Sequence, residues 1–528
     1  EAVPTPSFTN TPQSPICAGT SVLFTNTSNV LNIPCQEPVY SWTITPIAGT
    51  PATSSGYQFV SPSTATTQNA NILFTQPGSY SVVLNVTNSC GTFSSTPQII
   101  EVFGDPTVSF NPNTLTICDT APAGYTIDFS QSGTSPTYSV APYAPTSYVW
   151  SISGAGVTPA DYNFIGGTNA NSQYPQINFT SFKTYIITVQ VNGNCAGSNQ
   201  ASFTFTLKEM PVITNTNLTQ TICTGATTTP INLNSNMGSG TVFNWTVTAT
   251  NGITGFTNPG SGSVIPATTL NNPTNSAGTV TYIVTPSNNG CIGNPVNFII
   301  TVNPLPTITG TLNVCIGNST QLTGSATASS TNAWISSNTA VATVSNTGLV
   351  TGVSAGTTTI TYTNTNGCQT SVSVTVNPLP TITGNLIICA NTTTQLIGSA
   401  TAATSNPWSS SNTSVATVNN TGLVTGISGG TTTITYTNSN GCQTTTTITV
   451  NPLPTISGTL SVCIGNSTQL TGSATAATSN AWSSSNTTVA TVDNTGLVNG
   501  ISAGTTTITY TNSNGCQTTA TITVNPLP

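Results

Sequence analysis

Hydrophobic and polar residues alternate along the chain in short runs that are separated by turn-forming residues. In residues 431–437 the apolar side chains of Ile434 and Tyr436 are spaced by threonines, which predicts a strand with one buried face. The pair Asn440-Gly441 then predicts a tight turn, and Thr446–Val450 resumes the alternation as the returning strand. No stretch shows the 3.6-residue period of an amphipathic helix. The pattern predicts an all-β protein.

The C-terminal part of the chain repeats one segment three times. Leu305–Pro378 returns with few changes as Leu379–Pro452 and again as Leu453–Pro526, a period of 74 residues. A repeat of this length is sufficient for a small domain with its own core, so it indicates a string of similar modules. We therefore expect the function to come from the array rather than from a single site.

Six tryptophans, each in a strand-like context and each between two cysteines, mark six modules. This order is typical of an immunoglobulin-like sandwich, and we predict that every tryptophan is a core residue. The tryptophans are Trp42, Trp150, Trp245, Trp334, Trp408 and Trp482. Prolines at the junctions end strands and stiffen the links, so the predicted modules are 1–104, 105–209, 210–304, 305–378, 379–452 and 453–528. At roughly 35–40 Å for each sandwich, we expect a semi-rigid rod of about 200 Å.

Charged side chains make up only 2% of the chain. The only basic residues are Lys183 and Lys208, there is no histidine, and the formal net charge is −7. Without a basic patch we expect no binding of nucleic acid or anionic lipid, and no apolar run is long enough for membrane insertion. Because Val524–Pro528 matches the earlier junctions, we interpret the chain as a mature piece of a longer secreted protein, with further modules beyond residue 528.

The repeats carry a pattern that is similar to a known family. Trp408–Val418, Thr421–Gly426 and Gly430–Ile434 resemble the bacterial Ig-like domain of group 2 (Big_2), and the match covers all three C-terminal modules. The first three modules resemble the PKD-like domains of secreted Bacteroidota proteins, most clearly in Gly78–Gly91. Arrays of this kind, joined by Asn-Pro-Leu-Pro, resemble the SprB-like gliding-motility adhesins. The resemblance implies a linear array of Ig-like/PKD-like sandwiches, export to the cell surface (attached to the outer membrane or in a filament) and a stalk or filament role.

Thirteen cysteines in a secreted, charge-poor chain predict disulfides. Each module has one early cysteine before a glycine-containing turn and one late cysteine in or after a late turn, and Cys35 is extra. The early cysteines are Cys17, Cys118, Cys223, Cys315, Cys389 and Cys463. The late cysteines are Cys90, Cys195, Cys291, Cys368, Cys442 and Cys516. Pairing within each module is the obvious scheme, and it leaves Cys35 over.

Strand topology favours pairing between neighbouring modules instead. Five strands lie between the two cysteines of a module, which places them at opposite poles about 20–25 Å apart, well beyond the reach of a disulfide. In an end-to-end array the early-cysteine pole of one module faces the late-cysteine pole of the next. We hypothesise the bridges Cys17–Cys195, Cys118–Cys291, Cys223–Cys368, Cys315–Cys442 and Cys389–Cys516, with Cys35 paired to Cys90 and Cys463 left for a module beyond residue 528. Disulfide mapping distinguishes the schemes, since a Cys315–Cys368 peptide would exclude pairing between modules.

The residue types that catalysis requires are scarce. Residues 305–452 contain no Asp, Glu, Lys, Arg or His, and a chain without histidine has neither a Ser-His-Asp triad nor a histidine metal site. We predict no enzyme, no cofactor and no metal. The alternative of a calcium site rests on Asp105, Asp119, Asp128 and Asp161, for which solvated loop carboxylates are the better-supported interpretation.

Two functions follow from the sequence. The first is a structural stalk or filament segment of a secreted cell-surface adhesin, for gliding motility or attachment. The second is a carbohydrate-binding module array that contacts surface glycans through aromatic-rich loops such as Tyr138–Tyr148, with Tyr143 as the residue to test. In addition, Asp119-Thr-Ala121 resembles the O-glycosylation motif of Bacteroidota, which implies a sugar on Thr120.

Overall fold

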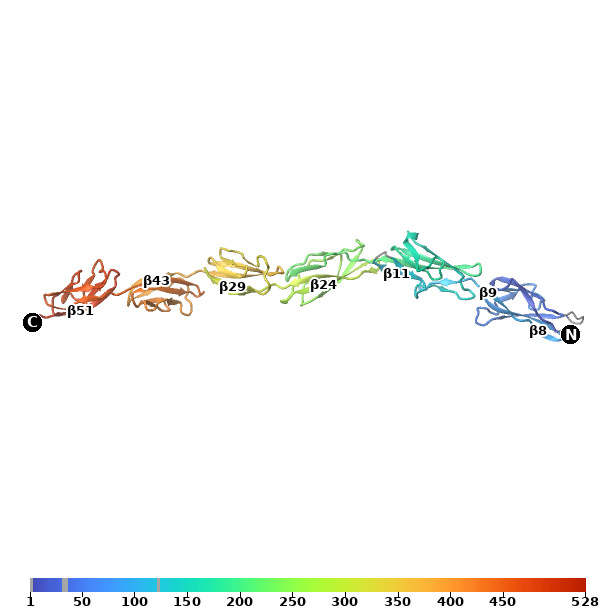
Figure 1. The fold of residues 1–528 in the computed structure, drawn as a ribbon, viewed down its shortest axis with the longest axis horizontal. Coiled ribbons are helices and arrows are strands. Elements are labelled where there is room, and N and C mark those ends of the chain that lie inside the picture. The colour runs from blue at the N-terminus through green and yellow to red at the C-terminus, as the bar shows by residue number, and fades with distance from the viewer. Residues whose placement is uncertain (1–2, 31–36, 121–123) are drawn as a thin grey trace.

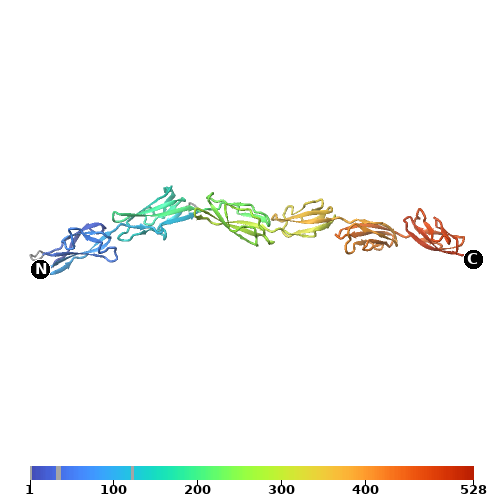
Figure 2. The ribbon, with the colours of Figure 1, turned by 180° about the vertical axis from the view of Figure 1, so that it is seen from behind.

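The computed structural model describes residues 3–30, 37–120 and 124–528, in which six β-sandwiches follow one another end to end. They form a long, gently curved rod with the two termini at opposite ends (Figure 1), and the view from behind shows the same single file (Figure 2). The one helical element of the described residues is the short 3-10 turn η1 (Pro159–Asp161). The predicted fold class, an all-β tandem of Ig-like sandwiches, is confirmed.

The fourth module shows the architecture in its simplest form. One sheet has the strand order β27 (Ile308–Gly310), β29 (Ser319–Gly324), β32 (Leu349–Gly352), β31 (Ala342–Val344). The facing sheet has the order β28 (Asn313–Cys315), β34 (Gln369–Asn377), β33 (Gly356–Thr363), β30 (Trp334–Ser336). All of these pairs are antiparallel except one, because β28 runs parallel to the last strand, β34. We call β28 and its counterparts the early strand of each module.

The fifth and sixth modules repeat this plan. In the fifth, the sheet with the early strand contains β36 (Ile387–Cys389), β43 (Gln443–Asn451), β42 (Gly430–Thr437) and β39 (Trp408–Ser410). Its other strands are β35 (Ile382–Thr383), β38 (Ile397–Gly398), β37 (Thr393–Gln395), β41 (Leu423–Gly426) and β40 (Ala416–Val418). In the sixth, the two sheets are β45 (Ser461–Cys463), β51 (Gln517–Asn525), β50 (Gly504–Thr511), β47 (Trp482–Ser484), and β44 (Ile456–Gly458), β46 (Ser467–Gly472), β49 (Leu497–Gly500), β48 (Ala490–Val492). Ile434 and Tyr436 are buried in β42, as the alternation predicted.

The first three modules are larger but keep the sheet with the early strand. In the first it contains β2 (Ile16–Cys17), β9 (Gln98–Phe103), β7 (Gly78–Asn88), β4 (Val39–Pro46) and β8 (Gly91–Ser94). In the second it contains β11 (Thr114–Asp119), β18 (Ser198–Glu209), β17 (Thr184–Asn192) and β14 (Ser147–Ser153). In the third it contains β19 (Thr219–Cys223), β26 (Val296–Asn303), β24 (Gly278–Asn288), β21 (Val242–Ala249), β22 (Gly260–Ser261) and β25 (Cys291–Ile292).

The strands that complete these three modules form their facing layers. The first module has β1 (Phe8–Thr11), β3 (Thr20–Asn26), β6 (Ala70–Phe74) and β5 (Tyr57–Phe59). The second has β12 (Tyr125–Asp128), β16 (Gln176–Phe179) and β15 (Tyr162–Ile165), together with the separate pair β10 (Val108–Ser109) and β13 (Thr137–Tyr138). The third has the short pair β20 (Ile231–Asn232) and β23 (Val264–Ile265).

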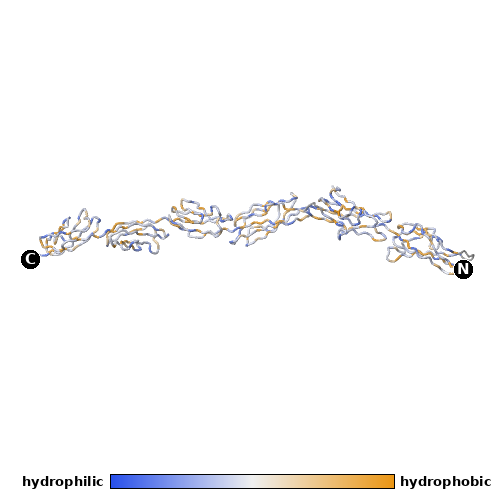
Figure 3. The backbone as a smooth tube through the Cα atoms, in the orientation of Figure 1, coloured by the Kyte–Doolittle hydropathy of each residue, from blue (hydrophilic) through white to orange (hydrophobic). Residues whose placement is uncertain are grey.

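Each module closes its own hydrophobic core around its tryptophan. All six indoles are at most 7% exposed, so the prediction that they are core residues is confirmed. In the fourth module the ring centroids of Trp334 and Tyr362 lie 4.6 Å apart, and the Tyr362 hydroxyl donates a hydrogen bond to the carbonyl oxygen of Ala326. Hydrophobic and hydrophilic positions alternate along every module of the rod (Figure 3), as expected when each sandwich buries only its inner faces. Because each module has its own separate core, the contacts at the junctions determine how the modules are aligned.

Candidate functional site: the disulfide-bridged junctions

All the disulfides among the described residues cross the junctions between modules. The Cα–Cα distances of the bridges are 5.5 to 5.7 Å, within the normal range for a disulfide. The bridges are Cys17–Cys195, Cys118–Cys291, Cys223–Cys368, Cys315–Cys442 and Cys389–Cys516. The structure thus brings together the same five pairs as the inter-module hypothesis.

The parallel pairing of the early strand with the last strand explains this geometry. Because β28 and β34 run in the same direction, Cys315 at the end of β28 lies beside Asn377 at the end of β34. Cys368 directly precedes β34, so it lies at the other pole of the same module, nine strand residues away. The early cysteine follows two short strands rather than the single strand that was expected, but five strands still separate it from Cys368. Each early cysteine is therefore placed where the chain leaves its module and faces the next one.

A buried asparagine shapes the turn that presents the late cysteine in each of the last three modules. In the fourth module the Asn364 carboxamide oxygen accepts hydrogen bonds from the backbone N–H groups of Asn366 and Cys368, both at 3.0 Å. Gly367 has a φ of +77°, which favours glycine. Cys368 is only 1% exposed as a result, so this half of the bridge is shielded from solvent. The sequence reasoning missed this asparagine, although Asn-x-Asn-Gly-Cys recurs with the same 74-residue period.

The junction between the second and third modules adds polar contacts to its disulfide. Lys208 donates a hydrogen bond of 2.7 Å from Nζ to the carbonyl oxygen of Asn289, in the late-cysteine turn of the third module. Asn236 of the third module donates a hydrogen bond of 2.7 Å to the Glu209 carboxylate. One of the two basic residues of the chain is thus used to fix a junction.

The junction between the first and second modules is packed around Gly104. A Cβ atom at this position would lie 2.4 Å from the ring of Tyr143 and 2.6 Å from Pro77, so only glycine fits between the two modules. The next residue, Asp105, lies against Gly197 in the late-cysteine turn in the same way. Tyr143 is therefore part of the junction. Its role in carbohydrate binding stays a prediction.

The remaining described cysteines, Cys90 and Cys463, lie near the two ends of the rod. Cys35 lies outside the described residues, so the proposed Cys35–Cys90 bridge stays a prediction. Cys90 lies in the exposed turn after β7, where its N–H donates to the Asn88 carboxamide at 2.9 Å. Cys463 ends β45 beside Asn525, the position that Cys315 and Cys389 occupy in the preceding repeats, and no disulfide joins it to another described residue.

The aromatic-rich loop of the second module forms one wall of a groove of about 540 Å³. The Tyr138 ring contacts those of Tyr148 and Tyr174, with centroid distances of 4.9 and 5.6 Å. The Tyr138 hydroxyl donates to the carbonyl oxygen of Gln173 at 2.7 Å, and burial raises the pKa of this hydroxyl. Tyr174 is 37% exposed and Val140 is 77% exposed, and no charged side chain lines the groove.

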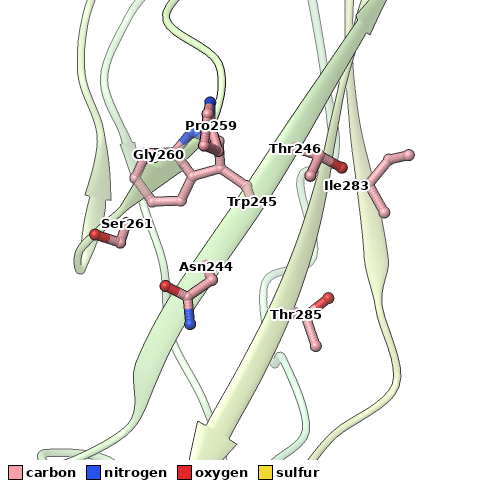
Figure 4. Close-up of a pocket in the computed structure, with 8 residues that line it drawn as sticks. All are labelled: Asn244, Trp245, Thr246, Pro259, Gly260, Ser261, Ile283 and Thr285. Carbon is pink, nitrogen blue, oxygen red and sulfur yellow. The ribbon is translucent and has the colours of Figure 1, made fainter.

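A second, smaller groove of about 390 Å³ lies on the third module (Figure 4). The indole of Trp245 lies next to Gly260 of β22, where a Cβ atom would come within 2.3 Å of the indole nitrogen. The outward side chains of Asn244 and Thr285 line it further along β21 and β24. All lining residues are neutral, so this groove offers no group for acid–base chemistry.

The acidic residues of the second module are engaged separately. The Lys183 ammonium lies 2.8 Å from the Asp161 carboxylate and, with hydrogen bonds from neighbouring residues, holds the pKa of Asp161 well below its usual range. The Ser130 hydroxyl and N–H lower the pKa of Asp128. In the described part of the chain, no group of three or more His, Cys, Asp and Glu side chains could hold a metal ion. Thr120 is exposed, and its N–H donates to the neighbouring carboxylate of Asp119, so a sugar there stays a prediction.

These features define a tandem array of Ig-like β-sandwiches joined covalently at their poles. Residues 220–306 match the PKD-like domain, and residues 306–376, 381–450 and 444–524 match the bacterial Ig-like domain of group 2. The chain is thus an all-β Ig-repeat protein with PKD-like and group 2 bacterial Ig-like domains. The PKD-like assignment of the first two modules stays a prediction. Over residues 3–30, 37–120 and 124–528, no helix has the length and hydrophobicity to span a bilayer.

Solved structures with tandem extracellular domains are similar to the chain at a low level. The N-terminal eight Ig domains of the Down syndrome cell adhesion molecule are 13% identical, covering 97% of this chain and 71% of that one, with a TM-score of 0.24. Sidekick-1 immunoglobulin domains 1–5 are 12% identical, with coverage of 85% and 99% and a TM-score of 0.22. The human desmocollin-1 ectodomain is 12% identical, with coverage of 80% and 95% and a TM-score of 0.25. Comparison with curated protein sequences finds no match.

Proposed function

We propose that the chain is a rigid segment of the stalk or filament of a secreted cell-surface adhesin, serving attachment or gliding motility in a member of the Bacteroidota. The observation that carries this proposal is that both the peptide chain and a disulfide cross every junction. Two covalent links side by side restrict bending more than a single linker does. The chain would then hold a binding tip at a distance from the cell. The proposed role is structural and not enzymatic.

The proposed location is the cell surface, either attached to the outer membrane or within a filament. The five bridges among the described residues support this location, because disulfides persist in oxidising compartments and are rare in the cytosol. The resemblance of the array to SprB-like adhesins supports the gliding role. Neither nucleic acid nor membrane insertion is part of the proposal.

The proposed partner at the C-terminal pole is a further module of the same kind, beyond residue 528. Cys463 lies beside Asn525, as Cys389 lies beside Asn451 in the fifth module, where the bridge to the next module forms. A seventh module with its own late cysteine would complete the same junction. Joining a copy of residues 453–528 to the chain tests this. A chymotryptic peptide that links Cys463 to the late cysteine of the added copy is expected, and a free Cys463 would contradict it.

Antibody labelling of intact cells tests the stalk. Antibodies against the second and the sixth module, applied to cells that produce the full-length protein, are expected to bind at two fixed heights roughly 150 Å apart, the length of four modules. Reduction of the disulfides is expected to broaden this spacing, because single peptide linkers then join the modules. Labelling at one common height, or only after the cells are opened, would contradict the stalk.

The groove lined by Tyr138, Tyr148 and Tyr174 in the second module favours a second candidate function, the binding of surface glycans. Its lining combines three aromatic rings with the neutral polar groups of Thr137 and Gln173, a composition suited to an uncharged sugar. Tyr174→Ala removes the exposed ring, and on a glycan array it is expected to abolish binding by the whole chain. Tyr143→Ala is the matched control, since Tyr143 lies outside the groove. Equal loss in both variants would exclude this groove as the binding site, and no binding by the unaltered chain would exclude the function.

A further inference from the structure

The two covalent links at each junction belong to different strands. The peptide linker leads from the last strand of one module to the early strand of the next, at four of the five junctions through one short strand (β10, β27, β35 or β44). The disulfide instead leads from the early strand of one module to the beginning of the last strand of the next. Two continuous covalent routes result when both kinds of link are followed along the rod.

Route 1 begins at the first early cysteine. It runs through Cys17, Cys195, β18, β19, Cys223, Cys368, β34, β36, Cys389, Cys516 and β51. Route 2 begins in the last strand of the first module. It runs through β9, β11, Cys118, Cys291, β26, β28, Cys315, Cys442, β43, β45 and Cys463. Along each route a disulfide and a peptide linker alternate from one junction to the next.

The two routes lie side by side through the four inner modules. They are the parallel strand pairs β11–β18, β19–β26, β28–β34 and β36–β43. In the second module this pair is in register over six residues, from Thr114 opposite Thr204 to Asp119 opposite Glu209. Of the other strands of these modules, the short strands β10, β25, β27 and β35 each lie on one route, and the rest lie in chain segments that both routes bypass.

We infer that this parallel pair is a duplicated covalent cable and that the oxidised chain is close to inextensible, an inference that rests on the proposed role as a stalk or filament segment. Along route 1 only 28 residue steps separate Cys195 from Cys223, and 21 separate Cys368 from Cys389. Fully extended, these 49 steps and three bridges reach about 190 Å from Cys17 to Cys516. The four folded modules between them already span roughly 140–160 Å. The same 499 residues without bridges would extend to about 1,700 Å.

The two routes differ in what the loss of one bridge does to a chain that is pulled by its ends. Route 1 is the shorter one, so removal of the Cys315–Cys442 bridge of route 2 leaves the limit of 49 steps unchanged. Removal of the Cys223–Cys368 bridge forces the tension onto route 2. The shortest path from Cys17 to Cys516 then has 154 steps, because it crosses 77 residues of the second module and 53 of the fifth. The modules that unravel are not the two beside the lost bridge.

Single-molecule force spectroscopy on the whole oxidised chain, held at its two ends, tests this inference. The unaltered chain is expected to lengthen by less than about 100 Å before it detaches from the probe. The Cys223→Ser/Cys368→Ser variant is expected to release roughly 370 Å more, the length of 105 additional residue steps. Cys315→Ser/Cys442→Ser removes a chemically equivalent bridge and is expected to release no more than the unaltered chain. Cys463→Ser, which removes no bridge between described residues, is the control for cysteine replacement.

The inference would be overturned if the unaltered oxidised chain lengthened in steps that correspond to the unfolding of whole modules. It would also be overturned if the two double variants lengthened by equal amounts. If a double variant fails to fold, titration of the unaltered chain with a reductant provides the same comparison, because its releases should grow toward the full contour length. None of these results bears on where the protein stands on the cell. Failure of the cable and failure of the stalk are therefore distinguishable.

Discussion

Replacing Cys315 and Cys442 by serine removes the bridge between the fourth and fifth modules and leaves the other four bridges between described residues in place. When the fourth module of the unaltered chain unfolds alone, Cys315 and Pro378 both stay attached to the folded fifth module. The 63 residues between them form a closed loop, and closing such a loop restricts the unfolded state by about 4 kcal/mol in the chain-entropy estimate. Cys368 is bridged to the third module, and this additional anchor shortens the effective loop. The free energy by which the Cys315–Cys442 bridge stabilises the fourth module is then about 3 kcal/mol.

The same calculation applies to the fifth module, because Cys442 and residue 379 are both attached to the fourth. We therefore expect the variant to lose about 3–4 kcal/mol of unfolding free energy in two modules at once. For modules of 74 residues this is a large part of the total, since small domains are stable by only about 5–15 kcal/mol. The expected loss is confined to these two modules, because the unfolded states of the other four are unchanged.

Native-state hydrogen exchange measures this module by module. The slowest amides of β33 and β42 are expected to exchange roughly 100- to 1,000-fold faster in the variant, the factor that 3–4 kcal/mol represents. The corresponding strands β7, β17 and β50 are internal controls and should not change. A change below tenfold in both affected modules would refute the reasoning, and so would a uniform change in all six.

Three further results are expected. The sixth module, with one bridged junction instead of two, should exchange faster than the nearly identical fifth in the unaltered chain, and equal rates would contradict the loop argument. Gly324→Ala should cost about 1–3 kcal/mol in urea denaturation, because the new Cβ lies 2.3 Å from the Tyr362 ring, whereas the adjacent exposed Thr323→Ala should cost little. Lys183→Met should lower the melting temperature of the second module at pH 7. Because the pKa of Asp161 is lowered in the folded state, this difference should persist above the unfolded-state pKa of about 3.9 and disappear as the pH falls further below it.

Much of the fold is encoded in local patterns that can be read without coordinates. The alternation around Ile434 and Tyr436 gives a strand with one buried face, and the 74-residue period gives the number of repeated modules. The hypothesis of bridges between modules also needs only local information, because an odd number of strands between two positions places them at opposite poles. It depends on the number of strands between the two cysteines, which the alternating segments and the turns between them indicate, and not on the packing of any loop.

The lateral contacts could not be predicted, because they depend on how loops from different modules meet. Nothing local distinguishes Tyr143, which packs on Gly104 at a junction, from Tyr138, which lines a groove. Both tyrosines belong to the same short loop region, and the chain path through it decides the side on which each ring lies. The contact of Lys208 with Asn289 is equally long-range, since 81 residues separate the two.

The parallel pairing of the early and last strands makes the junction bridge a consequence of topology. A cysteine that ends the early strand lies beside the end of the last strand, whereas a cysteine in the final turn lies beside its beginning. The length of the last strand therefore separates them, about 30 Å for the nine residues of β34, and no side-chain rotation closes that distance within one module. The early cysteine is within reach only of the next module, and the late cysteine only of the preceding one. Near-identity of successive repeats has a physical use here, because each module must fit an early-cysteine pole on one side and a late-cysteine pole on the other.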